Sequence, residues 1–220
     1  MILYGSSLSP YVRKVVIFAA EKGITLEHNR RIGPLDMNPE FREVSPFGQI
    51  PGFRDGDYTL CDSSAIVAYL EAKHPEPNLI PTEAKARGRT IMFDEFADIR
   101  IFGCGRKMFW NRVVAPLFMR MPGDPAAAAA AEANELPPIL AYLDRIVPDS
   151  LYLVEDRLTL ADIAVASPLV NLQHAGAAID AGKYPRLAAY RDAMFARPSF
   201  AATIAVETAS IQKARAATAA

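Results

Sequence analysis

The first third of the chain alternates short apolar runs with amphipathic stretches, which is the pattern of a small α/β unit. Apolar runs of about four residues predict buried strands, and apolar positions spaced three to four apart predict helices. The expected order is β-α-β-(α)-β-β-α, with strands at residues 1–4 and 24–27, a hairpin turn at Asp55-Gly56-Asp57, and helices that begin after Ser9 and Asp62.

The rest of the chain changes character after a proline-punctuated segment. Apolar positions beyond it repeat with a helical period and leave almost no strand signal, although Pro116 is expected to interrupt a helix and Pro137-Pro138 to break or restart one. We therefore expect an α/β domain at residues 1–78, a linker at about 75–86 and an all-helical domain at residues 87–220.

Composition and charge narrow the class of protein without identifying a function. The 220 residues are 51% hydrophobic and 22% charged, with a formal net charge of −1, as in ordinary globular proteins. Mixed charges predict neither nucleic-acid nor membrane binding, and no apolar run approaches the ~20 residues of a membrane span. The N-terminus carries no secretory signal pattern. Two scattered cysteines and three scattered histidines indicate no disulfide framework and no metal site, so we expect a cytoplasmic protein.

The stretch from residue 6 to residue 16 combines a strand end with a helix start. Ser9 occupies the helix N-cap position, and Pro10 occupies the first helical position. One interpretation is that Ser9 only caps the helix. The other is that its hydroxyl stabilises an anion, because a helix N-terminus has unpaired N–H groups and a positive dipole end. A thiolate is feasible, since lowering a thiol pKa by ~2 units requires about 2.7 kcal/mol, which one charge-assisted hydrogen bond and the helix end together supply.

Two more segments of the first domain have a functional and a structural interpretation. At Gln49-Ile50-Pro51, a cis proline bond would turn the Ile50 backbone outward to pair with a peptide-like ligand, and an ordinary edge-strand proline fits equally well. Asp62-Ser63 at a helix start can hold a ligand ammonium and carboxylate, or can simply cap the helix. Three such signals in one small unit are unlikely to coincide by chance.

Taken in order, these motifs resemble the cytosolic glutathione S-transferases, and most closely the serine-type phi, tau and zeta-like classes and their bacterial relatives. The resemblance covers nearly the whole chain and is specific as a set, although no single motif is. It implies a thioredoxin-like N-terminal domain followed by an all-helical C-terminal domain. The motifs are Ser9-x-x-x-Arg13-Lys14-Val15, Ser45-Pro-Phe-Gly-Gln-Ile-Pro51, Asp-Gly-Asp57, Leu60-x-Asp-Ser-x-Ala-Ile66, Leu158-Thr-Leu-Ala-Asp-Ile163, and Tyr184-Pro-Arg-Leu with Arg197-Pro-Ser-Phe200.

The resemblance also implies a ligand and its contacts. Glutathione, the co-substrate, would lie along the first domain, and a small-molecule electrophile would occupy a cleft facing the second. By the same resemblance Ser9 stabilises the thiolate, the strand-edge segment pairs with the cysteinyl part, and the second helix start holds the γ-glutamyl end. The implied glutathione-binding residues are Gln49, Ile50, Pro51, Asp62 and Ser63.

Some positions depart from the family pattern. The run from Ser6 to Pro10 also resembles the beta-class sequence Cys-Ser-Leu-Ser-Pro, a register that makes Ser6 the alternative to Ser9, although the count to Arg13 favours Ser9. Asp62 stands where many members have Glu or Gln, and therefore has a shorter reach.

The sequence indicates the electrophile site least specifically, because an aromatic stripe at helical spacing more often belongs to the core. Its candidates are Tyr11, Phe102, Arg106 and Phe109.

From these features we expect an enzyme, a glutathione transferase that activates the glutathione thiol as thiolate for attack on an alkyl or aryl electrophile. Two alternatives stay open: a glutathione-dependent isomerase or dehalogenase, and a non-catalytic glutathione-binding or ligand-carrier protein on the same fold. The family resemblance further implies a role in detoxification and a homodimer, built between the first domain of one chain and the helical domain of the other. Glutathione is the only cofactor expected.

Overall fold

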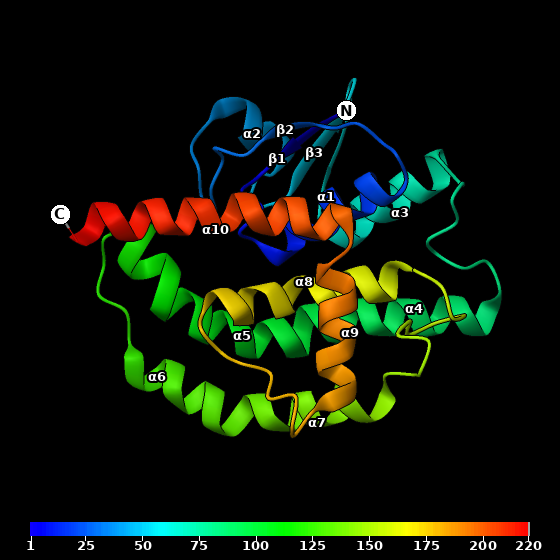
Figure 1. The fold of residues 1–220 in the computed structure, drawn as a ribbon. Helices are drawn as coiled ribbons and strands as arrows, with labels where there is room; N and C mark the ends of the chain where they lie inside the picture. The colour runs from blue at the N-terminus through cyan, green and yellow to red at the C-terminus, as the bar shows by residue number, and fades with distance from the viewer. Residues whose placement is uncertain (220) are drawn as a thin grey trace. The chain divides into compact units, whose positions relative to one another are not determined.

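A computed structural model describes residues 1–219, which form two compact units, Met1–Glu83 and Ala84–Ala220. The first unit is built on a four-stranded sheet in the order β2-β1-β3-β4, in which β1 pairs parallel with β2 and antiparallel with β3 (Figure 1). Its elements are β1 (Ile2–Tyr4), α1 (Pro10–Glu21), β2 (Glu27–Asn29), α2 (Pro39–Val44), β3 (Gly52–Asp55), β4 (Tyr58–Cys61) and α3 (Ser63–Lys73). The thioredoxin-like order predicted from the sequence is confirmed.

Helices cover both faces of this sheet. A Cβ on Gly52 would contact Val44 and Phe41, so alternate side chains of β3 point toward α2. The neighbouring Phe53 points the other way, where its ring lies 5.7 Å from that of Tyr69 in α3. Helix α1 packs beside α3. The buried side chains between the sheet and these two helices form the main core of the unit, and those under α2 form a second, smaller cluster.

The second strand lies later in the chain than the apolar pattern predicted. Residues 24–27 were expected to form it, whereas β2 begins at Glu27. Gly23 has a φ of +68°, and the N–H of Ile24 donates to the carbonyl of Ala19 at 2.8 Å. Residue 24 therefore completes the C-terminal turn of α1 and is not available to the sheet.

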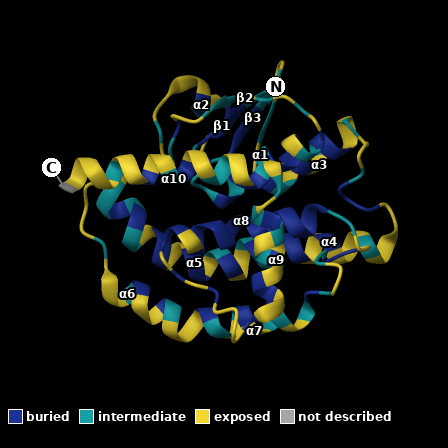
Figure 2. Cartoon of the chain, in the orientation of Figure 1, coloured by how far each residue is buried: buried dark blue, intermediate teal, exposed yellow. Residues whose placement is uncertain are grey.

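The second unit is built from helices, and within its described residues an isolated β-bridge pairs Val154 with Arg157. Helix α8 is buried along almost its whole length and packs against α4 and α5 (Figure 2). Such a helix, apolar on all sides, is the centre of the unit's core. The helical segments, of which the η segments are π-helical, are α4 (Ala84–Phe96), η1 (Ala97–Ile101), α5 (Phe102–Phe109), η2 (Trp110–Phe118), α6 (Pro125–Ala130), η3 (Ala131–Glu135), α7 (Leu136–Ile146), α8 (Leu160–His174), α9 (Pro185–Phe195) and α10 (Pro198–Ala219).

Three prolines of this unit were expected to interrupt or restart helices. Pro116 was expected to interrupt a helix, but it lies inside η2, which continues to Phe118. Pro116 has no N–H to donate to the helical hydrogen-bond ladder, and the segment ends two residues after it. Pro137 and Pro138 stand in the first turn of α7, directly after η3, and the chain stays helical across them, so the helix changes type at these residues and is not broken.

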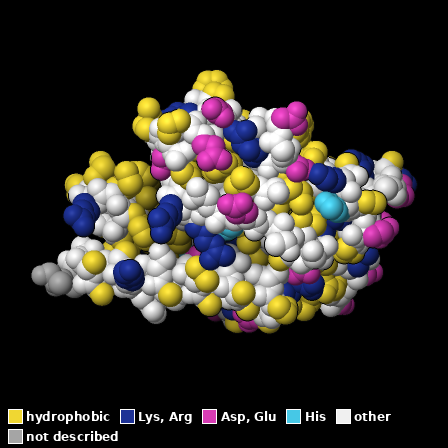
Figure 3. All heavy atoms as spheres, turned by 90° about the horizontal axis from the view of Figure 1, so that it is seen from above, with side chains coloured by type: hydrophobic (Ala, Val, Ile, Leu, Met, Phe, Trp, Pro, Cys, Tyr) yellow, Lys and Arg dark blue, Asp and Glu magenta, His cyan; other side chains and the backbone are white. Residues whose placement is uncertain are grey.

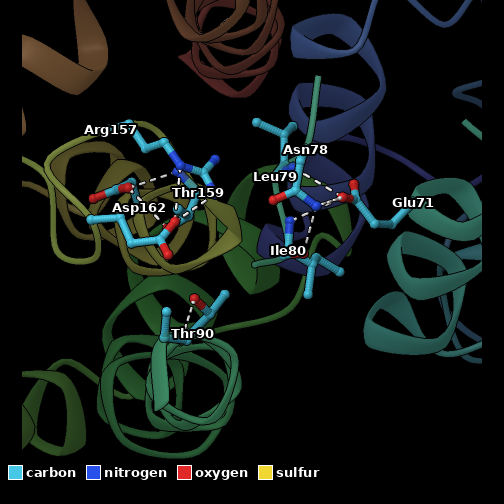
Figure 4. A network of polar contacts seen from close by, with 10 residues as sticks. Glu71, Asn78, Leu79, Ile80, Thr90, Arg157, Thr159 and Asp162 are labelled. Atoms are coloured by element: carbon cyan, nitrogen blue, oxygen red, sulfur yellow. Dashed lines mark hydrogen bonds and ion pairs between the residues drawn. The ribbon is translucent and has the colours of Figure 1, made fainter. Parts of the chain in front are cut away.

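Two buried polar networks hold connecting segments in place (Figure 4). In the first unit, one carboxylate oxygen of Glu71 accepts hydrogen bonds from the side chain of Asn78 and from the backbone N–H groups of residues 79 and 80. In the second unit, Asp162 accepts the N–H of Thr159 at 3.0 Å and that of Leu153 at 2.9 Å. The Asp162 contact with Thr159 forms a capping box at the start of α8.

On one face of the described residues the charged side chains do not separate by sign. Acidic and basic side chains are interspersed on the face shown in Figure 3. Among the helices of residues 1–219, none combines the length and the apolar composition that crossing a membrane requires.

Candidate functional site

The sheet register brings three separated segments to one edge of the first unit. Tyr4 pairs with Gly52, and Gly52 pairs with Cys61, so these residues form one row across β1, β3 and β4. Beyond this row the chain continues into Gly5, Pro51 and Asp62. Because neighbouring strands lie ~4.8 Å apart, ~10 Å separate the loop after β1 from the start of α3, about the length of three extended residues.

The loop between β1 and α1 packs closely against the segment before β3. Gly5 has a φ of +136°, and a Cβ at this position would lie 2.7 Å from Val12 Cγ2 and 2.9 Å from Ile50 Cβ. Both the conformation and the close approach require glycine. The loop that carries Ser6 and Ser9 is thereby held next to Ile50.

Ser9 is the N-cap residue of α1, yet its hydroxyl makes no capping hydrogen bond. Its backbone is fixed, because its N–H donates to the carbonyl of Ser6 at 3.1 Å and its carbonyl accepts from Arg13 at 2.9 Å. Within residues 1–219 no hydrogen bond uses the Ser9 hydroxyl, and the side chain is only half-buried. Simple capping, one of the two interpretations of the sequence, is not observed. The hydroxyl is a donor at the positive end of α1.

Ser6, the alternative to Ser9, lies in the same loop and is also half-buried. Its Oγ accepts from the N–H of Leu8 at 3.4 Å, a long contact that does not use the hydroxyl proton. Both serines therefore have a hydroxyl proton to donate, and the assignment of Ser9 stays a prediction.

The segment before β3 presents backbone groups without partners. The Ile50–Pro51 peptide bond is cis, as the family resemblance implied. The hydroxyl of Ser45 donates to the carbonyl of Gln49 at 2.7 Å, while the Gln49 side chain is exposed. Among the described residues no backbone hydrogen bond uses the N–H or the carbonyl of Ile50. These two groups are available to pair with an extended ligand.

Arg42 in α2 organises this segment and was not predicted from the sequence. Its guanidinium donates to the carbonyls of Asp36 at 2.7 Å, Leu35 at 3.1 Å and Pro46 at 3.2 Å. Gly48 passes directly over it, with a φ of +68° and no room for a side chain. Arg42 thereby joins the loops on both sides of α2. Gly48 is the one sequence signal that could have indicated such a close approach.

The start of α3 has donors and acceptors for a charged ligand. Asp62 caps the helix by accepting the N–H of Ala65 at 2.9 Å, so the capping interpretation applies to this residue. Its second carboxylate oxygen stays open to a ligand ammonium. Ser63 is buried, and no hydrogen bond within the described residues uses its hydroxyl. Lys14 donates to the neighbouring Ser64 at 3.1 Å and adds a positive charge beside the helix start, where an anion is favoured.

The candidates for the electrophile site fall in both units. Tyr11 is half-buried in α1. Phe102, Arg106 and Phe109 are spaced four and three residues apart in α5 and therefore share one helix face. Phe109 is only 5% exposed and belongs to the core, whereas Arg106 is exposed. Their role as a substrate site stays a prediction.

A cavity of about 480 Å³ lies within the second unit, on a different face of the same helical run. None of the three α5 candidates lines it. Cys104 at its wall contacts the carbonyl of Ala131 at 3.7 Å, and burial raises the pKa of this thiol to about 11. Cys104 is thus a packing residue. No group of three or more His, Cys, Asp and Glu side chains in residues 1–219 is arranged to hold a metal ion. The residues that line the 480 Å³ cavity include Phe96, Ile99, Arg100, Cys104, Lys107 and Tyr142.

Comparison with known proteins gives the same family for both units. Residues 3–78 match the family model "Glutathione S-transferase, N-terminal domain", and residues 110–205 match the model of the C-terminal domain. Human glutathione S-transferase theta-1 is 31% identical over 195 residues, which cover 86% of this chain and 80% of the relative. Glutathione S-transferase 3 from Zea mays is 30% identical over 213 residues, 92% of each chain.

A solved structure supports the fold. The crystal structure of a glutathione S-transferase from Rhodospirillum rubrum F11 aligns with a TM-score of 0.79 and 27% identity, covering 90% of this chain and 89% of that one. The theta class of the human relative was not among those named by the sequence resemblance. With both of its units matched, the chain belongs to the glutathione S-transferase family.

Proposed function

We propose that this protein is a glutathione transferase that binds glutathione on its first unit and stabilises the thiolate with the Ser9 hydroxyl. The observation that carries the proposal is the unpartnered Ser9 hydroxyl at the start of α1, in a loop that packs against the unpartnered backbone of Ile50. A hydroxyl that can donate to a thiolate thereby lies next to a backbone segment that can pair with a peptide. A cysteine-containing peptide requires both.

In the proposed complex the ligand extends along the edge of the sheet. The N–H and carbonyl of Ile50 pair with the cysteinyl residue. The α-ammonium of the γ-glutamyl end contacts Asp62, and its α-carboxylate contacts Ser63 and the first N–H groups of α3. The ~10 Å between the loop that carries Ser9 and the start of α3 accommodates the γ-glutamyl-cysteinyl part of the ligand, with its thiol at Ser9.

The proposed chemistry is nucleophilic substitution or addition by sulfur. The Ser9 hydroxyl keeps its proton and donates a hydrogen bond to the thiolate, and the proton of the glutathione thiol passes to solvent water. The thiol is about 3% ionised at pH 7 and becomes mostly ionised if its pKa falls by ~2 units. The sulfur lone pair then forms the new S–C bond, and the electron pair of the broken bond leaves with a halide or moves onto a conjugated carbonyl oxygen. Positioning of the two reactants contributes the remaining acceleration.

A titration of glutathione against wild type, Ser9→Ala and Ser6→Ala tests this assignment, with the ultraviolet absorbance of the thiolate followed against pH. We expect the wild type to lower the thiol pKa and Ser9→Ala to bind glutathione without that shift. Ser210→Ala, an exposed serine of α10, is the matched control. An unchanged curve for Ser9→Ala and a lost shift for Ser6→Ala would transfer the role to Ser6. Absence of glutathione binding by the wild type would refute the proposal.

The stoichiometry of glutathione separates conjugation from the alternatives. A panel of aryl and alkyl halides should consume one glutathione per product if the protein conjugates. An isomerase or dehalogenase would form product while the glutathione concentration stays constant, and a carrier would bind glutathione with no turnover.

We also propose that the protein forms a homodimer, as the family resemblance implies. In the first unit the loops around α2 leave Phe47 80%, Met37 77% and Leu35 69% exposed. Three large apolar side chains exposed in the loops of one unit support a protein interface there. Light scattering at micromolar concentration should give twice the chain mass, and Phe47→Ser should lower the dimer fraction more than Met121→Ser. A monomeric wild type would contradict this proposal.

A further inference from the structure

His28 in β2 contacts the loop that carries the proposed catalytic serine. Its Nε2 lies 2.8 Å from the carbonyl oxygen of Gly5, and its Nδ1 lies 3.2 Å from the Nε of Arg30. A carbonyl oxygen only accepts and a guanidinium only donates, so Nε2 carries the proton and Nδ1 does not. Burial lowers the pKa of His28 below its ordinary value, which favours this neutral ring. The imidazole is therefore a defined donor to Gly5.

This contact fixes one peptide unit from both ends. The carbonyl of the Gly5–Ser6 peptide accepts from His28, and its N–H donates to the carbonyl of Ile32 at 3.0 Å. The preceding N–H, that of Gly5, donates to Asn29 at 3.1 Å. The beginning of the loop is thus bonded entirely to β2 and to the segment that follows β2.

The orientation of this peptide determines where Ser9 lies. The carbonyl of Ser6 accepts the N–H of Ser9 at 3.1 Å, which closes the turn leading into α1. Gly5 has a φ of +136°, and a glycine can adopt more backbone conformations than any other residue. Hydrogen bonds from neighbouring residues are therefore needed to keep the Gly5 backbone in a single conformation. His28 donates the hydrogen bond that holds the Gly5 carbonyl.

We propose that His28 is a positioning residue for the transferase reaction: by holding the Gly5 carbonyl it fixes the turn from Ser6 to Ser9 and the direction in which the Ser9 hydroxyl donates. This inference rests on the proposed function. His28 acts through the loop backbone and transfers no proton to or from glutathione.

Three variants test the role. His28→Leu removes the donor, whereas His28→Gln places an amide N–H at about the position of Nε2 and should restore it. His74→Leu is the matched control, because His74 belongs to the same unit and its Nε2 has no hydrogen-bond partner in the described structure. The measurements are kcat and KM for glutathione with an aryl halide, the thiol pKa of bound glutathione, and the thermal midpoint.

We expect His28→Leu to lower kcat roughly 10- to 100-fold, the scale of a misplacement of about 1 Å, and to raise the pKa of the bound thiol. The KM for glutathione should change little, because its proposed anchors, Ile50, Asp62 and Ser63, lie outside this loop. His28→Gln should recover most of kcat and the lowered thiol pKa, and His74→Leu should behave as the wild type.

Two outcomes would refute the role of His28 and leave the proposed function intact. One is a His28→Leu protein with wild-type kcat and thiol pKa. The other is an equal loss of activity and thermal stability in the Leu and Gln variants, which would make His28 a purely structural residue. If the wild type itself binds glutathione without lowering its thiol pKa, the proposed function fails, and the inference about His28 fails with it.

Discussion

Replacing Glu71 should destabilise the first unit more than replacing the lysine with which it pairs. The ammonium of Lys22 lies 2.7 Å from Glu71, and the two side chains are 0% and 11% exposed. Without Glu71, the buried ammonium keeps one hydrogen-bond acceptor among the described residues, the carbonyl of Pro77 at 2.6 Å, and the donors of residues 78–80 lose the Glu71 carboxylate. Leaving one buried charge unpaired costs about 3–5 kcal/mol, and orphaned buried donors add about 1 kcal/mol or more. Glu71→Leu should therefore lose about 5 kcal/mol.

Lys22→Met should lose only about 2 kcal/mol, because the remaining carboxylate keeps its three N–H donors. Urea unfolding followed by far-ultraviolet circular dichroism measures both variants, and the fluorescence of Trp110, the only tryptophan, follows the second unit separately. The double variant should be more stable than Glu71→Leu, since no charge stays buried alone. Equal losses in the two single variants, or simple additivity in the double variant, would refute this reasoning.

Three further predictions concern other contacts. Gly5→Ala should cost at least about 2 kcal/mol of unfolding free energy, because its Cβ would lie 2.7 Å from Val12 Cγ2; wild-type stability in urea would contradict the close packing of the loop. Asp162→Ala should cost about 3 kcal/mol, because the carboxylate accepts two backbone N–H groups at the start of α8; a loss below about 1 kcal/mol would show that water replaces it. Thiol titration at pH 8 should find one reactive thiol per native chain, the exposed Cys61, because a pKa of about 11 leaves Cys104 roughly one part in a thousand ionised. Two fast-reacting thiols in the native protein would contradict this assignment.

The elements of the first unit were predictable where a terminus is fixed by neighbouring residues. Pro10 starts α1, the Asp55-Gly56-Asp57 turn joins β3 to β4, and Asp62 starts α3, all as local chemistry predicts. Strand β2 was misplaced because Ile24 has the apolar character of a strand residue, while the hydrogen bond that assigns it to the end of α1 depends on the conformation of Gly23.

The residues that support the site were not predictable in the same way. Arg42 and His28 act on backbone carbonyls, and a lone polar side chain in a sequence does not indicate its partner. The state of the Ser9 hydroxyl was equally undetermined, because a serine that caps and one that does not cap have the same sequence pattern. The glutathione contacts came from the family resemblance and stay predictions until a complex is measured.

A ligand that touches the ends of β1, β3 and β4 can bind only when these strands are paired, because only the sheet register brings the three ends together. Glutathione bound as proposed therefore stabilises the folded first unit and not the unfolded chain, by about 2.7 kcal/mol at a concentration 100 times the dissociation constant. That gain equals a large part of the stability of an ordinary domain. A rise in the glutathione concentration would then lower the frequency with which the first unit unfolds as well as raise the rate of turnover.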